Sequence, residues 1–193
     1  MRSKLGKFTL AAVAALSVNL LPVYSASAAE SSAIESGVTV LDPGEFVWQP
    51  QNGPSGDVDV VVSIPLQAVY VYRGGTLIGV STASTGKPGY DTPVGTFEIL
   101  QKRREHYSNR YDNAPMPFMQ RLTWDGIALH GGRIPGYPAS HGCIRLPTAF
   151  ARHLFGVTEL GATVHVLDSA PSPDEALTIA RSGFGGGVQL AGN

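Results

Sequence analysis

Short strands separated by turns dominate the sequence that follows residue 56. Residues 57–64 are rich in β-branched side chains, and residues 67–72 alternate along the chain. Gly74 and Gly75 indicate a turn, after which residues 76–82 return as a strand. No helical period covers this stretch, so the pattern predicts a mainly β fold.

Later segments extend the same pattern and add one helix. Further strands are predicted at residues 94–100, 118–123, 127–130 and 163–167. A short helix is predicted over 147–155, because Pro147 suits a first helical position and Gly156 follows the end. We therefore expect a mainly β fold with mixed, sandwich-like sheets and one short helix.

Residues 102–117 form a long polar connection inside this domain. Long loops in compact domains are often functional. Both a solvated charged edge and a substrate-facing lid fit this composition.

The first 29 residues have the pattern of a secretory signal peptide. A basic start precedes an apolar run at residues 8–21, and small residues at 25–29 suit cleavage. A membrane anchor needs about 20 apolar residues, whereas this run is shorter and ends at Pro22. We expect an exported protein of the periplasm or cell wall, without a transmembrane anchor after cleavage.

The remaining chain is predicted to contain one domain between two less structured ends. Residues 30–56 are rich in Ser, Gly, Pro and Glu and are predicted to be an N-terminal arm or linker, with a short strand at 38–41. The domain is expected to cover residues 57–168. Residues 169–193 are predicted to be a disordered C-terminal tail, with one helical turn around 174–181.

Charge and cysteine content narrow the functional classes. Removing residues 1–29 takes away three basic residues and no acidic ones, leaving 11 basic against 15 acidic and a net charge of −4. Such a protein has no electrostatic footprint for nucleic acid. One cysteine excludes an internal disulfide. An unused thiol would be a liability in an oxidising compartment, so a reactive cysteine is favoured.

That cysteine, Cys143, lies in a segment whose residue types suit acyl transfer. His141 and Gly142 precede it, and His130 ends the apolar run before them. A thiol becomes nucleophilic as a thiolate, so nearby imidazoles and N–H groups would raise the thiolate fraction or supply a base during attack. Gly142 allows a tight backbone whose N–H groups converge on one point, as an oxyanion requires.

The segment resembles the catalytic domain of the L,D-transpeptidase (YkuD-type) family. That family's signature is His-Gly, a loop, then Ser/Thr-His-Gly-Cys, a hydrophobic residue and Asn or Arg. His130-Gly131 and residues 140–145 (Ser-His-Gly-Cys-Ile-Arg) match it position by position. Ser-Thr-Gly at 84–86, followed by Thr-Pro-x-Gly-x-Phe at 92–97, is similar to a second family pattern. Together the resemblance covers about residues 57–168.

The resemblance implies a peptidoglycan L,D-transpeptidase that needs no cofactor and no metal. Cys143 would attack the third residue of a stem tetrapeptide, release the terminal D-alanine and form a thioester. An amine of a second stem, an envelope lipoprotein or a D-amino acid would then accept the acyl group. Carbapenems would acylate the same sulfur.

Catalytic and binding roles follow from the same resemblance. His130 would be the base, with its ring oriented by the Gly131 carbonyl. His141 stays open as a rival base, because in an extended segment it points to the same face as Cys143. The N–H groups of His141, Gly142 and Cys143 would form the oxyanion hole.

Three residues are predicted to bind substrate. Arg145 presents a fixed positive fork that suits a substrate carboxylate, although it could equally brace the loop. Ser140 and Tyr90 are assigned to substrate binding beside it.

Other functions remain open from the sequence alone. The same site could use water as acceptor, giving an L,D-carboxypeptidase or an amidase that detaches wall-linked protein. His130, His141 and Cys143 could ligate zinc, although no further Cys and no His-x-x-x-His pattern supports this. A buried inert cysteine in a wall-binding module is the remaining alternative.

Overall fold

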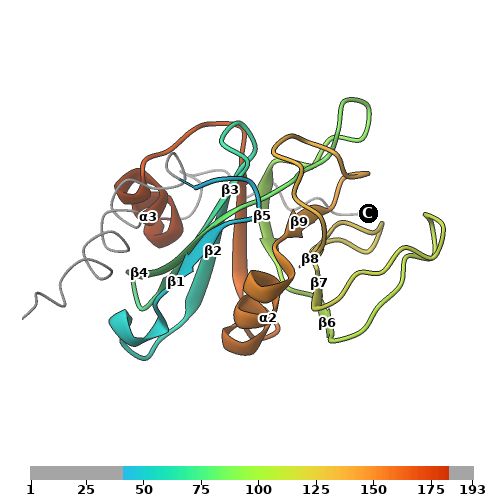
Figure 1. Cartoon of the computed structure of the whole chain (residues 1–193). Helices are drawn as coiled ribbons and strands as arrows, with labels where there is room; N and C mark the ends of the chain where they lie inside the picture. Colours follow the sequence, from blue (N-terminus) through green and yellow to red (C-terminus); the bar gives the residue numbers. More distant parts are fainter. Residues whose placement is uncertain (1–40, 183–193) are drawn as a thin grey trace, which may run out of the picture.

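A computed structural model describes residues 41–182 of the chain as two β-sheets with helices beside them (Figure 1). The predicted signal peptide, nearly all of the predicted strand at 38–41 and residues 183–193 lie outside the described residues. No helix within 41–182 is long and apolar enough to span a membrane.

The larger sheet is mixed. Its strands are, in spatial order, β1 (Phe46–Trp48), β4 (Thr76–Thr82), β3 (Ala68–Arg73), β2 (Val58–Ser63), β10 (Thr163–Leu167) and β5 (Gly95–Glu98). Neighbours pair antiparallel except β10, which runs parallel to β2. The alternating and β-branched runs seen in the sequence therefore form most of one sheet.

The smaller sheet carries the segments that flank Cys143. Its order is β6 (Gln101–Arg103), β7 (Met119–Arg121), β8 (Ala128–Gly131) and β9 (Ile144–Leu146). β6, β7 and β8 pair antiparallel, whereas β8 and β9 are parallel. Helix α2 (Thr148–Val157) follows β9 directly.

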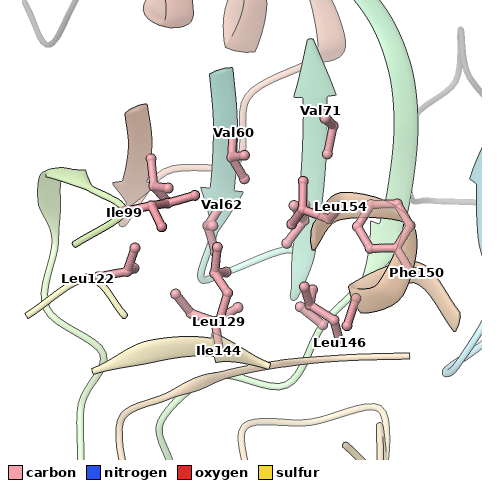
Figure 2. Close-up of a cluster of buried hydrophobic side chains, with 14 of the residues drawn as sticks. Val60, Val62, Val71, Ile99, Leu122, Leu129, Ile144, Leu146, Phe150 and Leu154 are labelled. Carbon is pink, nitrogen blue, oxygen red and sulfur yellow. The ribbon is translucent and has the colours of Figure 1, made fainter. Parts of the chain in front are cut away.

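The main hydrophobic core fills the space between the two sheets. Figure 2 shows Val60, Val62 and Val71 of the larger sheet facing Leu129, Ile144 and Leu146 of the smaller one, with Phe150 and Leu154 of α2 at the side; all eight are fully buried. Burying such side chains contributes about 1.5–3 kcal/mol each. This core fixes the relative position of the sheets and thereby the site above β8 and β9. The predicted mainly β, mixed-sheet fold is confirmed.

The opposite face of the larger sheet is also covered, which corrects the predicted tail. Residues 173–182 form a second long helix, α3 (Pro173–Ser182), that packs on β2 and β3. Ala176 of this helix is fully buried. The hydroxyls of Tyr70 and Tyr72 donate to the carbonyls of Pro171 (3.3 Å) and Pro173 (2.6 Å). The helical turn expected around 174–181 is thus a helix of ten residues, and the disorder expected from residue 169 is wrong for residues 173–182.

The predicted N-terminal arm also belongs partly to the fold. β1 pairs with β4, and Trp48 packs edge-on against Phe150 with ring centroids 5.4 Å apart. The same indole stacks on His153 of α2, again at 5.4 Å. A domain that starts at residue 57 would therefore leave out strand β1. Pairing with β4, and not the local composition, makes residues 46–48 a strand.

Helix α2 ends later than predicted. Gly156 lies inside the helix, which ends at Val157. The terminal carbonyls are satisfied by Thr158, whose N–H and hydroxyl both donate to Leu154 O, and by the ammonium of Lys102, 2.8 Å from Phe155 O. A cap supplied by a distant lysine leaves no local sequence signal.

Strands β6 and β9 were not predicted. β6 is a polar edge strand, and edge strands are often charged because this discourages further pairing. β9 has only three residues and pairs parallel with β8, through a connection that local patterns do not reveal.

The docking of α3 can be tested by charging its buried face. Ala176→Asp should lower the free energy of unfolding by about 2–4 kcal/mol, because an unpaired carboxylate would be buried. The matched Thr178→Asp change lies on the exposed face of the same helix and should cost less than about 1 kcal/mol. Urea denaturation measures both, and equal effects would contradict the packing of α3 on the sheet.

Candidate active site

The parallel pairing of β8 with β9 brings the two halves of the histidine–cysteine motif together. Leu129 lies opposite Ile144 and His130 opposite Arg145. Cys143 immediately precedes β9, so the pairing brings it next to the strand that carries His130, although 13 positions separate the two residues in sequence. All four residues of β8 are buried, which holds His130 on a rigid element.

His130 is held in one orientation and kept neutral. Its Nδ1–H donates to the carbonyl of Gly131 at 2.9 Å, because a carbonyl can only accept. This leaves the lone pair on Nε2 as the proton acceptor. Burial lowers the pKa of His130 to about 4; the bond to Gly131 opposes that shift, while the charges of Arg145 and His106 add to it.

The thiol of Cys143 is also neutral at rest. Its Sγ donates to the carbonyl of Gly126 at 3.4 Å. Burial raises the pKa of the thiol, and a backbone hydrogen bond from Ala128 and the charges of Arg145 and Arg121 only partly oppose this. The expectation that the surroundings raise the thiolate fraction is therefore wrong. Of the two alternatives, this leaves a base that takes the thiol proton at the moment of attack.

A hydroxyl organises the turn before Cys143. Ser140 Oγ donates to Cys143 O at 2.5 Å and accepts from Gly142 N at 3.1 Å. Gly142 has φ of +107°, and a Cβ there would lie 2.8 Å from Ile127 Cδ1. Only glycine fits both constraints.

This turn alters the predicted oxyanion hole. The Gly142 N–H is already bonded to Ser140, so it is not free to bind an oxyanion, and that assignment is corrected. Among residues 41–182, no hydrogen-bond acceptor occupies the N–H of His141 or Cys143. These two donors remain the candidates.

Residues of the second sequence pattern, at 84–86 and 92–97, form hydrogen bonds with the same turn and with Arg145. Ser84 and Arg145 exchange backbone hydrogen bonds of 2.9 and 3.0 Å. Thr92 Oγ1 donates to Gly142 O at 2.8 Å and accepts from Gly86 N at 2.9 Å. A Cβ on Gly86 would lie 1.9 Å from Tyr90 O. The buried Thr92 was not predicted as a site residue, although the Thr-Pro-x-Gly-x-Phe pattern contains it.

His141 lies in an aromatic cluster. Its ring stacks on Tyr111 with centroids 4.3 Å apart and meets the edge of Tyr90 at 4.7 Å. Burial and the charges of Lys87 and Arg145 lower its pKa, against a smaller opposing effect of Asp112. No hydrogen bond joins it to Cys143 within the described residues.

A cavity of about 390 Å³ opens beside Cys143, a size typical of small-ligand sites. Five predicted site residues line it: His130, Ser140, His141, Cys143 and Arg145. Tyr90 does not; it contacts His141 from outside the cavity. Residues 106–116 form the facing wall, joined to the catalytic segment by the Tyr111–His141 stack. The long polar connection at residues 102–117, for which the sequence left open a charged edge or a lid, therefore borders the site.

The side chain of Arg145 packs closely on Gly132, the second residue after His130. A Cβ on Gly132 would lie 3.3–3.5 Å from the side-chain carbons of Arg145. The aliphatic part of Arg145 thus crosses the Gly132 backbone, and both residues line the cavity.

Within residues 41–182, no three His, Cys, Asp or Glu side chains are grouped to hold a metal ion. His130, His141 and Cys143 therefore do not form such a ligand set.

The two-sheet fold and this site place the chain among known proteins. The family model of the L,D-transpeptidase catalytic domain, YkuD, matches residues 57–166. This match covers more than half of the chain, and the chain belongs to the YkuD L,D-transpeptidase family.

Individual relatives agree with this assignment. L,D-transpeptidase 1 of Mycobacterium tuberculosis is 29% identical over 123 residues, covering 55% of this chain and 49% of the relative. A crystal structure of an L,D-transpeptidase from M. tuberculosis H37Rv matches with a TM-score of 0.55 at 27% identity, over 57% of each chain. An LD transpeptidase in complex with imipenem matches with 0.53 at 27%, over 57% and 58%. The chain spans about half the length of the relative that it matches by sequence.

The buried state of His130 predicts a pH-dependent stability. Its folded-state pKa of about 4 lies below the ordinary 6.5, so the unfolded chain binds the proton more readily. The contribution of neutral His130 to the free energy of unfolding is constant above pH 6.5. It is lost as the pH falls toward 4, by about 3 kcal/mol in total. Urea denaturation at pH 7.5 and 4.5 should show a smaller acid loss in His130→Gln than in the unmodified protein. An equal loss in both would contradict a buried neutral imidazole.

Proposed function

We propose that the protein is a peptidoglycan L,D-transpeptidase in which Cys143 is the nucleophile and His130 the general base. The supporting observation is the oriented, neutral imidazole on the strand beside the half-buried thiol, at the wall of a cavity. Membership of the family supports stem tetrapeptides as the substrate class.

In the first half-reaction, Cys143 Sγ attacks the carbonyl of the third stem residue while His130 Nε2 takes the thiol proton. The resulting oxyanion accepts hydrogen bonds from the N–H groups of His141 and Cys143. The intermediate collapses with cleavage of the amide C–N bond. His130 returns its proton to the departing D-alanine amine, and a thioester remains.

In the second half-reaction, an acceptor amine attacks the thioester carbonyl and gives a proton to His130. Collapse breaks the C–S bond, and the Cys143 sulfur recovers the proton. A second stem, a lipoprotein lysine or a D-amino acid would supply the amine. Water in the same role gives hydrolysis, so the acceptor decides between the two activities.

Action on cell-wall peptides requires export, which we propose is directed by residues 1–29. A mature N-terminus near Ala29 or Glu30, determined by sequencing of envelope protein, would support this; an intact N-terminus would oppose it.

Cys143 should form a thioester of defined mass. Incubation with a stem tetrapeptide should release one D-alanine and add one tripeptide acyl group to the protein, as measured by intact mass. Adding an amine acceptor should discharge the adduct into a cross-linked product, whereas release as free tripeptide would assign hydrolysis. Imipenem, which a relative binds, should add once to the same residue.

The control follows from the single cysteine. Cys143→Ala should form no adduct with either compound, and Cys143→Ser should be nearly inactive, because a hydroxyl has a far higher pKa than a thiol and is a weaker nucleophile in a site arranged for sulfur. Acylation of Cys143→Ala, or an unmodified native protein after long incubation, would refute the cysteine mechanism.

The two histidines should differ in their effect on acylation. His130→Ala removes the proposed base and should slow thioester formation on the order of 10²–10⁴-fold. His141→Ala removes a ring packed between Tyr111 and Tyr90 and should act mainly on stability and substrate affinity. Single-turnover acylation rates, with circular dichroism as a folding check, separate the two. A folded but inactive His141→Ala beside an active His130→Ala would reverse the assignment.

A further inference from the structure

The cavity beside Cys143 is strongly basic in a chain that is not. The whole chain carries 14 Lys and Arg residues against 15 Asp and Glu. Four arginines line the cavity, at positions 110, 121, 133 and 145, against one acid, Asp112. Three further lining residues are histidines, and their pKa values are lowered, which keeps them neutral. The cavity therefore has an excess of about three positive charges.

None of these arginines has a carboxylate partner among residues 41–182. Arg121 donates to the amide oxygen of Gln101 at 3.1 Å and lies 6.0 Å from the centre of the Trp124 ring. The guanidinium groups of Arg110, Arg133 and Arg145 donate no hydrogen bond within the described residues. The side chains of Arg110 and Arg133 are exposed and that of Arg145 is half-buried, so their N–H donors are available to an anion in the cavity without breaking an ion pair.

Two of the four can be placed close to the reacting groups. A Cβ on Gly126 would lie 3.9 Å from Cδ, Nε and Cζ of Arg110, and the Gly126 carbonyl accepts the Cys143 thiol proton. Arg145 crosses Gly132 on the His130 side. These arginines come from different segments, so positive charge borders the sulfur from more than one direction.

A guanidinium binds a carboxylate through two parallel hydrogen bonds, which amides cannot reproduce. A stem tetrapeptide carries its terminal carboxylate and, where it is not amidated, side carboxylates on its γ-linked glutamate and on a diaminopimelate residue. Amidation converts each side carboxylate into a neutral group of nearly the same shape.

We propose that this cavity selects stem peptides whose side carboxylates are free and discriminates against amidated stems. Arg110 and Arg133, which lie outside the matched family motifs, supply this selectivity together with Arg145. The inference rests on the proposed function, because it specifies the substrate of the same site.

The test compares three synthetic tetrapeptides: both side carboxylates free, one amidated, and both amidated. Each amidation should lower kcat/KM for D-alanine release by roughly tenfold, the effect of losing a charge-assisted hydrogen bond. High salt should reduce the difference, because screening weakens the attraction. Equal rates for all three peptides would overturn the inference.

Arginine variants assign the selectivity. Arg110→Gln and Arg133→Gln should lower kcat/KM for the free peptide and leave the doubly amidated one nearly unchanged, so the ratio falls; Arg133→Lys should retain part of it. Arg104→Gln is the matched control, since Arg104 is exposed beside the same loop and does not line the cavity. An unchanged ratio in both Gln variants would overturn the inference even if the native protein discriminates.

Acylation by imipenem distinguishes a failure of the proposed function from a failure of the proposed selectivity. If Cys143 is acylated by imipenem but no peptide releases D-alanine, the proposed substrate class fails, and the selectivity with it. If all peptides react alike, the transpeptidase function stands and only the selectivity fails. Variants that acylate normally with imipenem are folded, so a changed ratio in them is not a folding defect.

Discussion

The parallel pairing of β8 with β9 is the contact on which the site depends. It brings Cys143, directly before β9, next to the strand that carries His130, 13 positions earlier in the sequence, and it places Arg145 opposite His130. Parallel pairing requires a connection that leaves the sheet and returns; here the connection carries Arg133, Ser140 and His141 past the cavity. The inter-sheet core beneath holds the pair in place, since Leu129, Ile144 and Leu146 belong to it. Packing and chemistry thus use the same two strands on opposite faces.

Desolvation decides how this pair can react. Burial lowers the pKa of His130 and raises that of Cys143, so a resting thiolate–imidazolium pair is disfavoured. The neutral pair protects a lone thiol from oxidation, because the thiolate is the form that oxidants attack. In the proposed mechanism, proton transfer therefore accompanies attack on the substrate instead of preceding it.

Local patterns predicted what local physics determines. The strands at 76–82 and 163–167 agree with the structure, because the Gly74-Gly75 turn marks the start of the first and residues 163–167 alternate between polar and apolar side chains up to Val166. The carbonyl of Gly131 was identified as the group that orients His130, and the structure contains that hydrogen bond. β9, the Lys102 cap of α2 and the Thr92–Gly142 bond arise from tertiary contacts and could not be read from neighbouring residues. The basic lining likewise gathers arginines from distant segments, which a mildly acidic composition conceals.

Helix α3 covers one face of the larger sheet, and this determines how far a folded fragment of the chain must extend. The family match ends at residue 166, yet α3 and the carbonyls of Pro171 and Pro173 lie beyond it. A fragment cut to the matched range would leave the hydroxyls of Tyr70 and Tyr72 without these acceptors and open an apolar sheet face to water. Such a face is a template for self-association. The folded unit is therefore wider than the range that the family model matches, and its outer helix shields from water a sheet face that lies away from the candidate site.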